Sequence, residues 1–161
     1  MDLVQGRIMP STWYPFDAFE RIGYAVFKLV GKGDLNTARV FGAFTMQETY
    51  HKVYENVLFQ EKDPTTVLKK FVTLRRQFFK FQDTDIDPLK MKALEENKVK
   101  MIIKAPEPSE YLEPYANQLA GGFEKLLEMA GAKDVQAKIL KIQSETEPTS
   151  EIELTWSNPE A

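Results

Sequence analysis

The sequence predicts an α+β fold in which N-terminal helices pack on a mostly antiparallel sheet, made of two hairpins separated by a long helix. Apolar residues recur at helical spacing through the first half, whereas from Leu89 onward two pairs of segments alternate apolar and polar residues. With 161 residues, 43% of them hydrophobic, the chain is sized for a single domain. We expect a helical half at 1–81, a hairpin, helix and hairpin at 82–156, and a tail at 157–161.

Four helices are predicted in the first half, each marked by a residue that favours a helix boundary. The markers are Pro15 and Gly31 at the two ends of the first helix, Asp34 before the second, Thr45 in a capping-box pattern before the third, and Asp63-Pro64 at the fourth. We also expect a break between the second and third helices at Gly42, since glycine is a poor helix former.

The second half changes from helical to alternating periodicity. We expect a hairpin around the turn at Glu96-Asn97, a long helix that ends at Gly131, and a second hairpin around the polar turn from Ser144 to Thr149. The alternating apolar residues of the last hairpin run from Val135 to Ile139 and from Ile152 to Trp156. One face of each hairpin is therefore expected to be buried.

The composition excludes several kinds of chemistry. The chain has no cysteine, so it forms no disulfide and offers no thiolate as a nucleophile or metal ligand. A net charge of −3 and a pI near 5.3 give no general attraction to nucleic acid or to anionic lipid. Because no segment is apolar over the length of a bilayer, we expect no membrane insertion and a bacterial cytoplasmic protein.

The sequence carries none of the common hydrolase, nucleotide-binding or metalloprotease motifs. Asp83, Asp85 and Asp87 imitate the start of a calcium loop, but Pro88 replaces the required glycine, so we expect no metal site. The single histidine, His51, lies off the main apolar stripe of its predicted helix, with no partner in the pattern to fix its tautomer. These absences favour a protein that is not an enzyme.

The order of elements over residues 64–156 resembles the 4-vinyl-reductase-type domain. That domain belongs to a superfamily with the haem-nitric-oxide/oxygen-binding domain and the transport-particle subunits of the Golgi. The small, apolar and tryptophan positions that carry the resemblance are Gly122-Phe123, Leu126-Leu127, Ala130-Gly131-Ala132, Asp134-Val135 and Trp156. The start from Trp13 to Pro15 is also similar to a group of such proteins from gliding and predatory deltaproteobacteria. The resemblance implies a sensory or assembly role and dimerisation through helices.

Two departures from the family pattern bear on function. Relatives often carry cysteines at the end of the penultimate strand and at the start of the last, where this chain has Ile142 and Ser150. The resemblance therefore implies no metal or redox role at that hairpin. The haem-binding branch uses a helical histidine for iron and a Tyr-x-Ser-x-Arg motif for the propionates, and that motif is absent here. We therefore expect no cofactor, and a haem held through His51 is the alternative.

Two glycines, Gly121 and Gly122, lie inside the long predicted helix, where they cost about 2 kcal/mol relative to alanines. Either the close approach of another backbone or a ligand against the bare helix would offset that cost. Aromatic residues that could line such a ligand pocket are Trp13, Tyr14, Phe16, Tyr111 and Tyr115. The same aromatic residues also suit a core, and both interpretations stay open.

The fourth predicted helix carries a basic stripe made of Lys69, Arg76 and Lys80, with Lys70 and Arg75 on its flanks. No acidic residue occurs in this helix, so the stripe has one sign of charge. It suits an acidic partner or a nucleotide phosphate, and it also suits a solvated face.

We therefore expect a non-enzymatic sensory or adaptor domain that binds a partner protein and, in a cavity, a small apolar ligand. A homodimer is a further expectation, and nucleic acid is not an expected partner. One alternative is a haem- or tetrapyrrole-binding gas sensor or enzyme that uses His51. Another is a regulator of a small GTPase or of cell polarity that uses Lys69, Arg76 and Lys80.

Overall fold

A computed structural model describes residues 14–76 and 89–158 of the chain. It confirms the predicted α+β fold. The helical elements are α1 (Phe16–Ala25), η2 (Val26–Val30), α2 (Leu35–Thr45), η3 (Met46–His51), α3 (Lys52–Leu58), α4 (Pro64–Arg75) and α5 (Leu112–Met129), where η marks a π-helical turn. The strands are β1 (Leu89–Glu95), β2 (Lys98–Ile103), β3 (Lys133–Lys141) and β4 (Ser150–Ser157).

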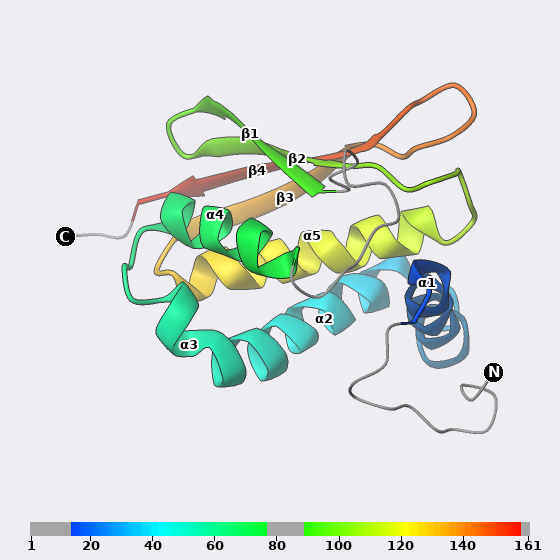
Figure 1. The fold of residues 1–161 in the computed structure, drawn as a ribbon, viewed down its shortest axis with the longest axis horizontal. Coiled ribbons are helices and arrows are strands. Elements are labelled where there is room, and N and C mark those ends of the chain that lie inside the picture. Colours follow the sequence, from blue (N-terminus) through cyan, green and yellow to red (C-terminus); the bar gives the residue numbers. More distant parts are fainter. Residues whose placement is uncertain (1–13, 77–88, 159–161) are drawn as a thin grey trace.

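The elements form three layers (Figure 1). The sheet is one outer layer, α4 and α5 lie beneath one of its faces, and α1, α2 and α3 form the other outer layer. Helix α5 is therefore central, because it touches the sheet on one side and α2 on the other. Its buried apolar side chains include Phe123, Leu126 and Leu127, all fully covered.

The strands of the described sheet run in the order β1-β2-β4-β3, and each neighbouring pair is antiparallel. Met101 of β2 and Ile139 of β3 both pair with Ile152 of β4, so these three side chains fall on the same inward face. Alternation buries Ile152, Leu154 and Trp156 of β4 against the helices, as the sequence pattern predicts. The two hairpins thus join through β2 and β4 into one sheet.

The second and third predicted helices form one helical run from α2 through η3 to a kink at Tyr54 in α3, and the predicted break at Gly42 is wrong. Gly42 is inside α2, where its lack of a side chain lets α5 come close, so glycine serves packing there and not termination. The capping-box prediction at Thr45 is also wrong, because Thr45 lies inside the same helical run. Its backbone is helical and its hydroxyl donates to the carbonyl of Phe41 at 2.9 Å, one turn back.

Other predicted boundaries are confirmed. The Asp63 side chain accepts a hydrogen bond from the backbone N–H of Thr66 at 2.8 Å, which caps the start of α4. Gly131 adopts a φ of 93° just after α5, the left-handed conformation that ends helices. The predicted continuation of the fourth helix to Lys80, and the acidic run from Asp83 to Asp87, lie outside the described residues.

Gln143 and Ser150 tie the far end of the β3–β4 hairpin to the chain that leaves β2. The Gln143 side chain accepts from the backbone N–H of Ala105 at 2.9 Å and donates to the Ala105 carbonyl at 3.0 Å. The backbone N–H of Gln143 donates to the Ser150 hydroxyl at 2.8 Å. Where relatives often have cysteine, Ser150 is buried and holds the hairpin by a hydrogen bond.

Among the helices in the described ranges, none combines the length and the apolar character required to cross a bilayer.

Candidate functional site

A small cavity lies between the outer helices and α5, where residues of α1, α2, η3, α4 and α5 meet. Its volume is about 70 Å³. The apolar part of its lining is Phe19, Met46, Phe71 and Leu119, the polar part is Thr45, Arg75, Tyr115 and Gln118, and two glycines, Gly42 and Gly122, complete it. We call this space the interlayer cavity.

Glycines set the spacing of the two helices beside the cavity. A Cβ atom on Gly42 would lie 1.8 Å from the carbonyl oxygen of Gln118, and one on Gly121 would lie 2.0 Å from that of Arg39. Both distances are far shorter than van der Waals contact, so α2 and α5 cross backbone against backbone. Gly122 differs, because its Cβ would meet the flexible end of Met46 at 3.3 Å.

A buried pair of polar side chains forms one wall of the interlayer cavity. The Arg75 guanidinium donates to the Tyr115 hydroxyl, and only 5% of Arg75 and 7% of Tyr115 are exposed. Burial raises the pKa of Tyr115 above its usual value, although the positive charge of Arg75 acts in the opposite direction. Tyr115 is therefore uncharged at physiological pH and acts as a hydrogen-bonding group.

Aromatic rings pack around Tyr115 from α1. Phe16 and Phe19 contact the Tyr115 ring edge to face, with centroid distances of 6.1 Å and 6.2 Å. Phe71 of α4 makes a similar contact with Phe123 of α5 at 5.9 Å. These contacts join the polar pair to the hydrophobic core.

The residues expected to line a pocket do not all meet at this cavity. Tyr115 and Gly122 line it and Phe16 contacts Tyr115, whereas Gly121 faces the backbone of α2. Tyr111 packs on Tyr24 instead, with ring centroids 4.9 Å apart. Tyr14 is half-buried outside the lining, and Trp13 lies outside the described residues.

Sequence reasoning missed the most distinctive cavity residue, Arg75. We expected it on the flank of the exposed basic stripe, and this is wrong, because Arg75 is buried against Tyr115. Its position four residues after Phe71 places it on the inward face of α4, which is the signal that the pattern contained. The stripe residues Lys69 and Arg76 are exposed, and Lys80 is outside the described residues.

A polar network on the side of α5 fastens the outer helices to the sheet. The Arg39 guanidinium of α2 lies 2.7 Å from a carboxylate oxygen of Glu124 on α5 and donates to the Ala137 carbonyl of β3, also at 2.7 Å. The same Glu124 oxygen accepts from the backbone N–H of Ala137 at 2.9 Å. Arg39 therefore links all three layers.

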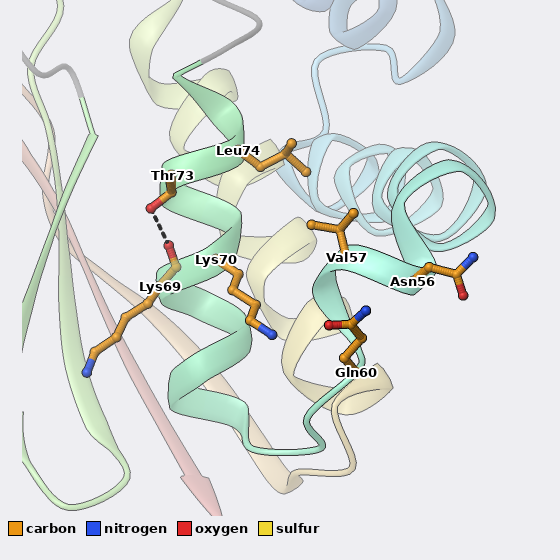
Figure 2. Close-up of a pocket in the computed structure, with 7 residues that line it drawn as sticks. All are labelled: Asn56, Val57, Gln60, Lys69, Lys70, Thr73 and Leu74. Carbon is orange, nitrogen blue, oxygen red and sulfur yellow. Dashed lines mark hydrogen bonds between the residues drawn. The ribbon is translucent and has the colours of Figure 1, made fainter.

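A second hollow is an open groove between α3 and α4, with a volume of about 480 Å³ (Figure 2). Val57, Asn56 and Gln60 line it from the α3 side, and Lys70 and Leu74 point toward them from α4. The groove also touches Lys69 and Thr73, although the Lys69 side chain extends to the other side of α4. We call it the α3–α4 groove.

The residues of the described ranges offer no set of three or more acidic, histidine or cysteine side chains placed to hold a metal ion. His51 is the last residue of η3. A π-helical turn inside a longer helix is rare and often occurs at functional sites.

Comparison with solved structures identifies the fold. The chain matches a point mutant of an H-NOX domain from T. tengcongensis with a TM-score of 0.64 and 18% identity, covering 95% of this chain and 80% of the other. It matches an oxygen-binding H-NOX domain related to soluble guanylate cyclases with a TM-score of 0.64 and 17% identity, over 95% and 78% of the two chains. An H-NOX protein from S. oneidensis in the Fe(II)NO ligation state matches with a TM-score of 0.64 and 12% identity, over 94% and 82%.

The chain thus has the fold of H-NOX domains, which is consistent with the sequence resemblance to the haem-nitric-oxide-binding superfamily. No protein-family model matches the sequence. No curated protein matches it either.

The expectation that the chain takes no cofactor is overturned by these comparisons. We based this expectation on the missing Tyr-x-Ser-x-Arg motif and on the absence of a sequence partner for His51. A missing motif excludes only one way of binding the haem carboxylates, because other residues can bind them. The fold is that of H-NOX domains, and structures among the matches concern haem redox potential and haem distortion in the H-NOX family. The shared fold therefore removes the ground for expecting that no cofactor binds.

Proposed function

We propose that this chain is a sensory domain that binds a haem-type tetrapyrrole between its outer helices and α5. The observation that carries the proposal is the correspondence of nearly the whole chain with H-NOX domains, at 94–96% coverage. Among those matches are an oxygen complex and an Fe(II)NO state. A haem gas sensor is therefore better supported for this chain than a domain without a cofactor.

The described residues fit a tetrapyrrole in their chemistry. The apolar side chains of Phe19, Phe71 and Leu119 suit the faces of a flat macrocycle. The Arg75 guanidinium suits its carboxylate groups, because a planar cation with several N–H donors binds carboxylates in a fixed geometry. Arg75 would hold an acidic substituent at the edge of the macrocycle.

Three side chains have the chemistry to hold the iron of a bound haem. The phenol of Tyr115 and the thioether of Met46 line the cavity, and the imidazole of His51, at the end of η3, is not among the described residues that line it. The haem would supply an iron that binds a diatomic gas, and the apolar lining would exclude water from it. His51 is our first choice, because the neutral imidazole is the commonest side-chain ligand for such metals.

The interlayer cavity has to widen to accept this ligand. Pockets for ligands of drug size occupy about 300–1,000 Å³, whereas the interlayer cavity measures about 70 Å³. Widening would require α2 and α5 to separate at this point, because Gly42 of α2 and Gln118 of α5 both line the cavity and their backbones lie close together. Ligand binding is thereby coupled to the spacing of α2 and α5, which gives the domain a way to report occupancy.

Reconstitution with haem tests the proposal. The purified chain is mixed with haem, and we expect a Soret absorption band that saturates at one haem per chain. His51→Ala should lose or shift the band, and Tyr115→Phe should shift it if the phenol is the ligand. A spectrum that matches free haem throughout the titration would overturn the proposal.

Narrower assignments belong to the same proposal. We assign the chain to the 4-vinyl-reductase-type branch of the superfamily, supported by the Gly122-Phe123 and Ala130-Gly131-Ala132 positions and by its deltaproteobacterial-type Trp-Tyr-Pro start. We also propose that residues 1–161 form one cytoplasmic domain. The packing of α5 against both the sheet and α2 supports the single domain.

A further inference from the structure

The α3–α4 groove is large enough for a ligand and lies apart from the interlayer cavity. Its volume of about 480 Å³ falls in the range of about 300–1,000 Å³ that is usual for binding pockets. Of the residues that line the two hollows, none is shared. The groove is therefore a second candidate binding site, separate from the interlayer cavity.

The floor of the groove is apolar and partly uncovered. Val57 is 52% exposed, although it is a large hydrophobic side chain, and Leu74 faces it from α4 (Figure 2). An isolated exposed valine is ordinary on a protein surface. Here the valine sits at the base of a groove, where a ligand side chain could cover it and gain from the burial.

Two side-chain amides stand beside this apolar floor. Asn56 and Gln60 are four residues apart on the same stretch of chain, and both line the groove. Neither amide makes a hydrogen bond to another residue of the described ranges. Each amide carries both a donor and an acceptor, which is the pair of groups needed to bind a peptide unit.

The charge of the groove favours an acidic occupant. Helix α4 contains no acidic residue, and Lys70 points from it into the groove. The Lys70 ammonium lies 3.6 Å from a carboxylate oxygen of Glu61, whose side chain is 67% exposed. Such exposed ion pairs contribute about 0–1 kcal/mol, so a better-placed carboxylate can take the place of Glu61.

We propose that the α3–α4 groove binds an acidic peptide segment of a partner protein. An apolar side chain of the segment covers Val57 and Leu74, an adjacent carboxylate pairs with Lys70, and the peptide backbone bonds to Asn56 and Gln60. The exposed cations Lys69 and Arg76 on the same helix add long-range attraction for the acidic segment. This proposal does not depend on tetrapyrrole binding, since the two hollows are separate.

Nuclear magnetic resonance of the ¹⁵N-labelled full chain tests the proposal, with the side-chain amide signals of Asn56 and Gln60 as reporters. The probe is the tripeptide N-acetyl-Glu-Leu-Glu-amide, and the matched neutral probe replaces both glutamates by glutamine. We expect saturable shifts of both amide signals with a dissociation constant of about 1 mM. The neutral probe should bind more weakly by up to about fivefold, the affinity that about 1 kcal/mol represents.

Variants locate the binding. Lys70→Glu should weaken binding at least tenfold, while Lys92→Glu, the same charge change on exposed β1, should leave it unchanged. Val57→Ser keeps the charges and removes the apolar floor, so it should also weaken binding. Because Val57 is half exposed, this variant should fold normally.

Three outcomes would overturn the proposal. The first is the absence of any shift at about 10 mM probe, well above the expected dissociation constant. The second is equal binding by wild type and by Lys70→Glu. The third is an equal response to sodium acetate alone, which would show that the groove senses charge and not a peptide.

Discussion

At the scale of single residues, the glycines of α2 and α5 decide how closely the helical layers approach. Gly42 and Gly121 each face a backbone carbonyl of the opposite helix, at a distance that leaves no room for a Cβ atom. The cost of glycine inside a helix is offset here by close backbone packing. Gly122 is next in sequence but faces a movable methionine.

These neighbouring glycines give a matched test. Gly121→Ala should lower the free energy of unfolding by about 2–4 kcal/mol, because the new methyl group would force α2 away from α5. Gly122→Ala should change it by about 1 kcal/mol or less, since the gain in helix propensity offsets a small shift of Met46. Urea denaturation of both variants measures the difference. Equal losses would contradict the backbone contact at Gly121.

The same glycines show the limit of sequence reasoning at this scale. Two glycines inside a strongly amphipathic helix predicted that another part of the protein or a ligand lies close to the helix backbone. The sequence could not say whether it was a backbone or a ligand, because the neighbour, α2, is far away in the chain. Arg75 differs, because its spacing from Phe71 indicated an inward position, and only its partner Tyr115, on another helix, was beyond the sequence pattern.

At the scale of elements, cross-strand ion pairs stabilise the solvent-facing side of the sheet. The Lys100 ammonium lies 2.9 Å from Glu151 and the Lys141 ammonium lies 3.4 Å from it. The hydrogen bond from Lys100 is the largest influence on Glu151 and holds the pKa of that carboxyl below its usual value. A carboxyl with a lowered pKa stabilises the fold above its unfolded pKa and loses that effect as the pH falls through the folded value.

Glu151→Gln should therefore destabilise the protein at neutral pH by about 1 kcal/mol or less, since ion pairs on a partly solvated sheet surface are weak. The difference from wild type should shrink as the pH falls through the lowered pKa of Glu151, where the carboxyl becomes protonated. Thermal unfolding of both proteins between about pH 3 and pH 7, roughly the range in which carboxyl groups titrate, measures this difference in stability. Glu107→Gln, in an exposed loop, is the control. A difference that stays constant with pH would exclude the ion pair as its cause.

Element types were largely predictable, while interruptions within elements were not. The strands and α5 follow from alternation, from helical spacing and from the glycine at the end, all of which are local signals. The π-helical turns η2 and η3 were not predicted, because the residues in them have ordinary helical patterns. Each turn continues directly from an α-helix, η2 from α1 and η3 from α2.

At the scale of the whole molecule, α5 and Arg39 join the layers into one unit. Helix α5 touches both the sheet and α2, and the Arg39 network connects α2, α5 and β3. We therefore expect one cooperative unfolding transition. In a Trp13→Phe variant, fluorescence of Trp156, which is buried on β4, and helical circular dichroism should give coincident urea curves. Separate midpoints would show that the helical half and the sheet unfold independently.

The central claim is that the interlayer cavity accepts a tetrapyrrole, and a haem titration of a cavity-filling variant tests it most directly. Leu119 lines the cavity, so Leu119→Trp fills the space, whereas Leu140→Trp makes the same change at a 41% exposed position of β3. We predict a saturating Soret band at one haem per chain for wild type and Leu140→Trp, and at least tenfold weaker binding for Leu119→Trp. No saturable band in wild type, or equal haem affinity in all three proteins, would contradict the claim.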